Sequence, residues 1–218
     1  MEATMHKLLA ALLGLSLLGT AWAGCDHRYF PVKEGWVWTY KSSLEGKTHT
    51  ITMSKVSDAG FTYTIQFDKG SVDTRWRCDA NGLSSPEYSG ANFGGKTQQF
   101  NFKTVDSKGA IIPNNLGIGS SWTYSFTLEG EMDNSKLTNN METSNKVVGL
   151  ETVTVPAGTF KAVRIESTST MKMSMNMGGK AKDLPANVVQ SISWYADGVG
   201  LVKSVAADIT TELVSLKK

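Results

Sequence analysis

The chain has 218 residues and is close to electrically neutral, with 22 lysines and arginines against 20 aspartates and glutamates. The basic residues are spread singly, without the cluster that binding to nucleic acid or to anionic lipid needs. Hydrophobic residues make up 40% of the chain, and six residues are tryptophan. This composition argues against nucleic-acid binding and against disorder, and it predicts a packed core.

The first 23 residues have the pattern of a secretory signal peptide. Lys7 ends a short polar head, residues 8–18 are an unbroken apolar run, and Ala21-Trp22-Ala23 has the small-x-small form of a cleavage site. The apolar run is shorter than the roughly 20 residues that span a bilayer. The sequence therefore predicts export, with a signal peptide over residues 1–23 and a single antiparallel β domain over residues 24–218.

The two cysteines allow two interpretations of the mature N-terminus. Cleavage after Ala23 leaves the even pair Cys25 and Cys78, which forms a disulfide by default in an oxidising compartment. The residues before Cys25 are also a degenerate lipobox, with Trp22 where leucine is usual. Lipidation would consume Cys25, leave Cys78 as a free thiol, and provide the only link to a membrane. The even cysteine count favours the disulfide.

A six-residue pattern occurs twice along the chain. It reads Gly-x-x-Trp-Thr-Tyr over residues 35–40 and over residues 119–124, each time a few residues after a proline (Pro31 and Pro113). So short a repeat is weak evidence of internal duplication. We expect each copy to be a turn that delivers an aromatic strand into the same core.

Between these two copies, alternating residues predict a β-hairpin. Apolar side chains occupy every second position from Phe61 to Phe67, and a second alternating run extends from Val72 to Cys78 after a Lys69-Gly70 turn. Trp76 and Cys78 share the inward face of the second run. Short, one-sided strands separated by tight turns are typical of antiparallel sheets.

Turn signals divide the second half of the chain. The polar residues 129–146 and 178–187 have the composition of loops or frayed hairpins. Pro156 and Gly158 predict a hairpin loop, because proline presets φ and glycine supplies a positive φ. Asp197-Gly198-Val199-Gly200 predicts a second turn.

Residues 163–177 predict a strand of unusual length. Fifteen residues in one register would extend roughly 50 Å at 3.3 Å per residue, so the strand must curl with its sheet or break at a bulge. The expected fold is all-β, with one curved antiparallel sheet of the half-barrel, open-barrel or sandwich-like kind. Small side chains followed by methionines would line its concave face, and they are the candidate ligand-binding residues: Ser167, Ser169, Met171, Met173, Met175 and Met177.

The methionine row has three interpretations. Packing of a strand face into the core is the simplest, because methionine is commonly buried. An adaptable apolar groove is the second, since methionine surfaces conform to varied partners. Capture of Cu(I) by thioethers comes last, because the spacing follows the pleat of a strand, which core packing would produce anyway.

The chain lacks the common catalytic and metal-binding motifs. It has no nucleophile elbow, no glycine-rich phosphate loop and no Cys-x-x-Cys pair. Cys25-Asp26-His27 lacks identifiable partner ligands, and a disulfide beside a surface histidine is the simpler explanation. The sequence therefore predicts no catalytic residues, no metal site and no cofactor.

Several motifs resemble the TapB-like exported bacterial proteins of unknown function. Cys25-x-x-x-Tyr29-Phe30-Pro31 and residues 35–40 match the opening of that family, and residues 155–160 and 194–202 match its second half. The stretch from Trp76 to Leu83 also fits, and the resemblance implies that Cys78 pairs with Cys25. It implies an envelope β-sheet protein, comparable by analogy to the curved-sheet lipoprotein carriers of the periplasm.

These observations predict an exported envelope protein that is not an enzyme. The leading hypothesis is that its concave sheet face holds an apolar ligand or a protein partner. The alternative is a structural or accessory component of an envelope assembly, with no small-molecule ligand. The expected location is periplasmic or secreted, or at a membrane through a lipid anchor on Cys25.

Overall fold

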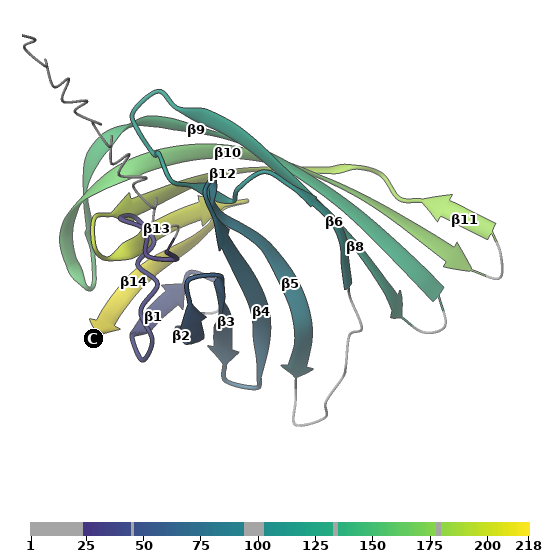
Figure 1. Ribbon diagram of the computed structural model, residues 1–218, viewed down its shortest axis with the longest axis horizontal. Helices are drawn as coiled ribbons and strands as arrows, with labels where there is room; N and C mark the ends of the chain where they lie inside the picture. Colours follow the sequence, from purple (N-terminus) through teal and green to yellow (C-terminus); the bar gives the residue numbers. More distant parts are fainter. Residues whose placement is uncertain (1–23, 45, 94–102, 133–134, 178–179) are drawn as a thin grey trace, which may run out of the picture.

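The computed structural model describes residues 24–44, 46–93, 103–132, 135–177 and 180–218. The expected signal peptide, residues 1–23, lies outside the described residues. Within the described ranges the regular structure is β-strand, and the strands form one sheet (Figure 1). No helix in this part of the chain could cross a membrane.

The sheet has 14 strands. They are β1 (Val37–Ser42), β2 (Thr48–Ser57), β3 (Gly60–Phe67), β4 (Gly70–Asp79), β5 (Gly82–Phe93), β6 (Lys103–Lys108), β7 (Ile112–Pro113), β8 (Ser121–Met132), β9 (Ser135–Val155), β10 (Gly158–Met177), β11 (Lys180–Asp183), β12 (Asn187–Ala196), β13 (Gly200–Ala206) and β14 (Ile209–Lys217). Their order across the sheet is β6-β8-β9-β10-β12-β13-β14-β1-β2-β3-β4-β5-β7, and β11 pairs with β10.

All the pairings are antiparallel, and the sheet does not close on itself. Strand β6 lies at one end of the order and β7 at the other. Figure 1 shows the sheet curving so that β1 to β5 lie below the long arch of β9 and β10. The prediction of an all-β fold with one curved antiparallel sheet is confirmed.

The predicted turns set the strand registers. The predicted hairpin of β3 and β4 is present, and its register places Phe61 opposite Trp76 and Phe67 opposite Gly70. Gly158 begins β10 with a φ of 137°, and Gly200 begins β13 with a φ of 98°. Both values are strained for a residue with a Cβ, so glycine is needed at these two strand starts.

The long strand is present and is longer than expected. Strand β10 has 20 residues and pairs along its length with β9, which has 21. The register shifts between Arg164 and Ile165, where β9 contributes the extra residue Val148. The sequence predicted that so long a strand would either curl or break at a bulge. Both occur, because the pair of β9 and β10 curls at one end (Figure 1) and also carries a bulge.

The polar stretch over residues 129–146 is not a loop. It forms the end of β8 and more than half of β9, and the hairpin places Met132 opposite Ser135. Its side chains alternate, with Leu137 and Thr143 buried and Lys136 and Ser144 exposed. Of the two predicted alternatives, a loop or a frayed hairpin, the structure has a hairpin, because β8 and β10 satisfy the backbone of β9 on both sides and outweigh its low strand propensity.

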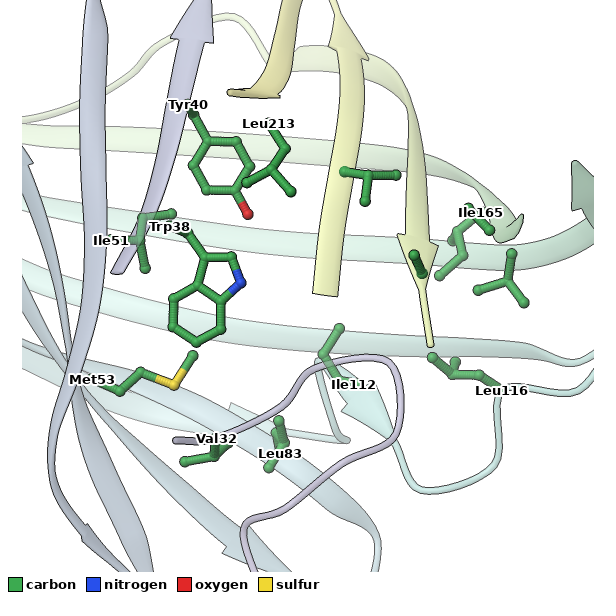
Figure 2. Close-up of a cluster of buried hydrophobic side chains, with 14 of the residues drawn as sticks. Val32, Trp38, Tyr40, Ile51, Met53, Leu83, Ile112, Leu116, Ile165 and Leu213 are labelled. Carbon is green, nitrogen blue, oxygen red and sulfur yellow. The ribbon is translucent and has the colours of Figure 1, made fainter. Parts of the chain in front are cut away.

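The core lies under the arch, and two connecting segments help to fill it. Residues 24–36 run across the concave side, where Val32 is 4% exposed, and residues 109–119 add buried Ile112 and Leu116. Figure 2 shows Val32 beside Leu83, which is itself only 2% exposed. The interior of the sheet is therefore packed by these two segments, the second of which includes the short strand β7, and is not left as an empty barrel.

The repeated Gly-x-x-Trp-Thr-Tyr pattern has one structural role in both places. Gly35 and Gly119 both have positive φ angles, 80° and 87°. The indole Nε1 of Trp38 donates to the Val199 carbonyl at 2.7 Å, and that of Trp122 donates to the Ile111 carbonyl at 3.1 Å. Each copy thus turns into a strand whose tryptophan holds a connecting segment against the core.

A network of contacts fastens the N-terminal segment, residues 24–36. The structure contains the disulfide between Cys25 and Cys78, with the two Cα atoms 5.2 Å apart. The Arg28 guanidinium contacts the Asp197 carboxylate at 2.6 Å, and the amide of Gly198 donates to the Arg28 carbonyl at 2.9 Å. This segment is therefore tied to β4 on one side and to the β12–β13 turn on the other.

His27 is buried in this segment, which corrects the expectation of a surface histidine. Only 6% of the residue is exposed. Its Nε2 hydrogen-bonds the Pro113 carbonyl at 3.0 Å, and its Nδ1 accepts from the Tyr29 amide at 3.1 Å. This arrangement fits the neutral ring, with the proton on Nε2. Burial lowers the pKa of His27 below its ordinary value of 6.5, against the opposing effects of the Pro113 carbonyl and Asp26.

We expect the protein to lose stability as the pH falls below about 6.5, the unperturbed histidine value. The unfolded chain then takes up a proton that folded His27 resists, because burial disfavours the charged ring. Urea unfolding at pH 7.5 and 5.0 measures the change. A His27→Gln variant should show less pH dependence, and His49→Gln corrects for the second histidine, whose pKa burial also lowers. An unchanged pH dependence in His27→Gln would contradict the assignment.

Candidate ligand-binding face

The candidate site is the inner face of β8, β9, β10 and β12, defined as the side on which Ser167 and Ser169 lie. Strand pairing places Ser167 between Asn145 and Ser191, and Ser169 between Thr143 and Val189. Because side chains alternate along a strand, all these residues face the same way. The face continues in one direction toward Ile165 and in the other toward the methionines.

The middle of the inner face is polar, and its groups are bonded to one another. The Ser167 hydroxyl donates to Asn145 Oδ1 at 2.7 Å, and the hydroxyls of Thr143 and Ser169 lie 2.9 Å apart. Thr143 is 2% exposed and Asn145 8% exposed. Buried polar side chains are costly unless they are bonded, and these bonds meet that need.

A cavity of about 150 Å³, named here the hydroxyl-lined cavity, opens on this polar region. Ser167, Ser169, Ser191 and Ser193 contribute to its wall, with Tyr195 at one side. The small side chains leave the space, as the sequence suggested for Ser167 and Ser169. The cavity is large enough for a few waters or for one small polar group.

The methionines continue the inner face beyond Ser169. Met171, Met173 and Met175 alternate with exposed or half-buried residues of the outer face, and each is half-buried. The hydroxyl-lined cavity stops short of all three. The backbone of Met177 ends β10, and its side chain lies outside the described residues.

Residues of β8 and β9 complete an apolar region around these methionines. Phe126 and Leu128 on β8 and Leu137 on β9 are buried, and Met141 is half-buried. Strand pairing places Met141 between Phe126 and Met171. The methionines keep accessible surface although the neighbouring side chains of β8 and β9 are buried. Packing into the core therefore does not cover the methionines completely.

Asn139 is a polar exception within this apolar region. It lies between Leu128 on β8 and Met173 on β10. Its Oδ1 atom is buried and has no hydrogen-bond partner among the residues that the structure describes. Such an unpaired buried acceptor costs about 1–3 kcal/mol, and in a native fold it calls for an explanation.

The sequence alone did not point to Asn139, because residues 129–146 have the composition of a loop or a frayed hairpin. An alternating pattern was nevertheless present in the sequence. Leu137, Met141 and Thr143 lie at every second position, and Asn139 occupies the remaining position of the same series. Only the pairing with β10 shows that this asparagine shares a face with the predicted methionines.

A broad groove of about 1420 Å³ lies mainly on the opposite, outer face. Its lining includes Lys146, Glu166, Thr168 and Gln190, whose side chains alternate with those of the inner face, and Asp208 in the β13–β14 turn. Val188 also contributes to it and is 58% exposed. The sequence did not predict this groove, because its lining comes from β8, β9, β10, β12 and the β13–β14 turn, which are far apart in the chain.

The described residues contain no group of three or more histidine, cysteine, aspartate or glutamate side chains that could hold a metal ion. Arg164 forms ion pairs with two carboxylates on the outer face. Arg164 contacts Glu166 at 2.7 Å and Glu151 at 3.6 Å. The inner face thus presents hydroxyls, amides, thioethers and apolar side chains, which bind by shape and hydrogen bonding.

Together the fold and this face define a β protein of one open, curved sheet, whose packed inner side contains small cavities. The chain belongs to the DUF3108-like family, whose model matches residues 104–218. That is more than half of the chain, and it includes the whole candidate face. The TapB-like family suggested by the motifs is not named in the matches described here. No curated protein matches the chain.

Three solved structures are similar to the chain. A candidate lipoprotein from Parabacteroides distasonis has 17% identity and a TM-score of 0.50, over 88% of this chain and 99% of that one. A candidate exported protein with a YmcC-like fold from Bacteroides fragilis has 16% identity and a TM-score of 0.45, over 88% of this chain and 100% of that one. The hypothetical lipoprotein YmcC from Escherichia coli has 14% identity and a TM-score of 0.42, over 87% of this chain and 89% of that one. At such identities the likeness to the first concerns the fold alone.

Proposed function

We propose that this is an exported, non-catalytic binding protein that holds an apolar ligand against the methionines of its inner face. The observation that carries the proposal is the unpartnered Oδ1 atom of Asn139 within that apolar region. An acceptor buried among apolar side chains is explained if a ligand supplies the donor. The ligand would then be an apolar molecule with at least one hydroxyl or amide hydrogen.

The side chains around Asn139 suit such a ligand. Met141, Met171 and Met173 are flexible and polarizable, so they can conform to an apolar chain without a preformed rigid pocket. The polar region around Ser167 and Ser169 lies further along the same strand and offers hydroxyls to a polar end group. The inner face therefore has an apolar part and a polar part in sequence along β10.

Export is supported by two features of the chain and by its structural relatives. The N-terminal residues have the pattern of a signal peptide, and the Cys25–Cys78 disulfide suits an oxidising compartment. The similar solved structures carry descriptions as lipoproteins or exported proteins. Because the disulfide uses the Cys25 sulfur that a lipid anchor would need, we propose a periplasmic or secreted protein without that anchor.

The outer groove supports a second candidate function, a component of an envelope assembly that binds a protein partner. Exposed Val188 and the charged residues Lys146 and Glu166 lie in this groove, a mixture found in protein interfaces. A photo-crosslinker at Thr168 would capture such a partner in stoichiometric amounts. A crosslinker at the inner-face residue Ser169 should not.

The ligand proposal is tested with the apolar fluorescent probe N-phenyl-1-naphthylamine. We expect saturable fluorescence enhancement by the wild-type protein, and at least a tenfold loss of affinity in Met173→Lys, because the lysine places a charge in the apolar region. Titration of the purified protein after extraction with organic solvent measures the effect. Mass spectrometry of the extract identifies the natural ligand.

The matched control is Lys172→Glu, the neighbouring residue on the outer face of the same strand. It changes charge by two units but is exposed, so probe affinity should stay within twofold of wild type. If Met173→Lys folds normally and binds the probe as wild type does, the inner-face site is wrong. The same conclusion follows if Lys172→Glu weakens binding as much as Met173→Lys does.

A further inference from the structure

A second inner cavity lies away from the methionines of β10, between β1 to β4 and the start of β13. Its volume is about 150 Å³, and aromatic side chains form most of its wall, among them Phe30, Trp38, Tyr63, Trp76 and Tyr195. We name it the aromatic cavity. In Figure 2 the side chains of Trp38 and Met53, which both border it, lie close together.

The walls of the aromatic cavity are held firmly. The ring of Trp76 stacks on that of Phe30 at 5.4 Å and on that of Phe61 at 5.8 Å between centroids. Phe30 belongs to the N-terminal segment, which the Cys25–Cys78 disulfide ties to β4. The cavity therefore has a fixed shape, unlike the methionine region.

Most polar groups of the wall already have partners within the protein. The Trp38 indole donates to the Val199 carbonyl at 2.7 Å, and the Tyr40 hydroxyl donates to the Leu201 carbonyl at 2.8 Å. The Trp76 indole donates to the Thr74 hydroxyl at 3.1 Å. The hydroxyls of Tyr63 and Tyr195 have no hydrogen-bond partner among the described residues.

Both of these tyrosines are removed from bulk water and still keep accessible surface. Burial raises the pKa of Tyr63 and of Tyr195 well above the ordinary value of 10.0. Each is nevertheless half-buried by exposed area. Burial from bulk water and a partly accessible surface are compatible if that surface faces a space inside the protein. The aromatic cavity is such a space, and both residues border it.

The size of the cavity defines what it can take. An apolar cavity of about 150 Å³ holds one benzene-sized molecule. Tyr195 also borders the hydroxyl-lined cavity, so a small substituent could extend toward Ser193 without a change of fold. Aromatic walls favour an aromatic guest through offset and edge-to-face contacts.

We infer that the aromatic cavity is a binding site for a molecule with a single aromatic ring and one hydroxyl group. This hydroxyl would form a hydrogen bond with the hydroxyl of Tyr63 or Tyr195. The ring would lie against Trp38 and Trp76, and its hydroxyl would meet a tyrosine hydroxyl that otherwise lacks a partner. This site is separate from the proposed apolar-ligand face, and neither proposal depends on the other.

The test compares 4-fluorophenol with fluorobenzene as probes, by ¹⁹F NMR titration of the full mature protein. We expect both to bind saturably, and 4-fluorophenol to bind more tightly. Tyr63→Phe together with Tyr195→Phe should weaken 4-fluorophenol roughly fivefold, the effect of one hydrogen bond, and leave fluorobenzene unchanged. Tyr29→Phe, a tyrosine that does not border the cavity, is the matched control and should change neither affinity.

A cavity-filling variant gives an independent measurement. Ile51 borders the cavity, and Ile51→Phe should abolish binding of both probes if the thermal unfolding of the variant shows that it folds. Met173→Lys should leave both affinities unchanged, which separates this site from the methionine face. The inference is overturned if neither probe binds saturably to the wild type, which would show a cavity that holds only water. It is equally overturned if the double Tyr→Phe variant binds 4-fluorophenol as the wild type does.

Discussion

Replacing Cys78 with serine should lower the free energy of unfolding by about 4 kcal/mol. The disulfide joins residues that are 53 positions apart, so breaking it releases a long loop in the unfolded chain. The Cα separation of 5.2 Å lies within the range that unstrained disulfides adopt, so little of this gain is lost to poor backbone placement. For a domain of this size the melting temperature should fall by roughly 8–16 °C.

The effect also has a cause in the folded state. Without the bond, residues 24–36 are held by His27, Arg28 and the packing of Phe30 and Val32. The Arg28–Asp197 pair is largely exposed and contributes little. We therefore expect the N-terminal segment to open before the rest of the sheet unfolds, which hydrogen exchange at the Phe30 amide would detect.

Urea unfolding of the wild type, Cys25→Ser, Cys78→Ser and the double variant measures the loss. All three variants should be equally destabilised, because each removes the same bond. Reductant should bring the wild type to the same level. If Cys25 instead carries a lipid, Cys25→Ser alone would release the protein from the membrane, and Cys78→Ser would not alter stability. The intact mass of the mature protein, with and without reductant, separates these cases directly.

Trp38→Ala should cost about 3–5 kcal/mol, the range for a buried large aromatic side chain. Trp38 is 3% exposed in the centre of the core shown in Figure 2. Its indole N–H also satisfies the Val199 carbonyl at 2.7 Å, so truncation leaves both a cavity and an acceptor that has lost its partner. Thermal unfolding monitored by circular dichroism measures the loss.

The second copy of the repeated pattern provides the control. Trp122 makes the equivalent bond, to the Ile111 carbonyl, but is only half-buried. Trp122→Ala should therefore cost less than Trp38→Ala, because less apolar surface is lost from the interior. Equal costs for the two variants would show that the indole hydrogen bond, and not burial, dominates at both positions.

Several local features of this fold were predictable from neighbouring residues. Alternation predicted the hairpin of β3 and β4, and Gly158 and Gly200 mark turns that need their positive φ angles. The length of the run from Val163 implied curling or a bulge, and both occur. Each of these follows from the pleat of a strand or from the steric limits of φ, which act over a few residues.

Other features depended on residues far apart in the chain. Asn139 acquires meaning only from its pairing with Leu128 and Met173, and its polar surroundings in the sequence pointed to a loop. His27 is buried only because Pro113 and the disulfide hold its segment against the sheet. No local pattern encodes such contacts.

The sequence by itself determined that the chain has an export signal pattern, alternating strands with defined turns, and one face of β10 made of serines followed by methionines. These depend on local steric preference and on side-chain alternation. Only the tertiary structure decided which strands flank that face, where the cavities form and which polar atoms have no partner. The reason is physical, because each cavity is enclosed by several strands that are distant in the chain. The hydroxyl-lined cavity uses β8, β9, β10 and β12, and the aromatic cavity uses β1 to β4 and β12. The curvature of the whole sheet brings these strands together.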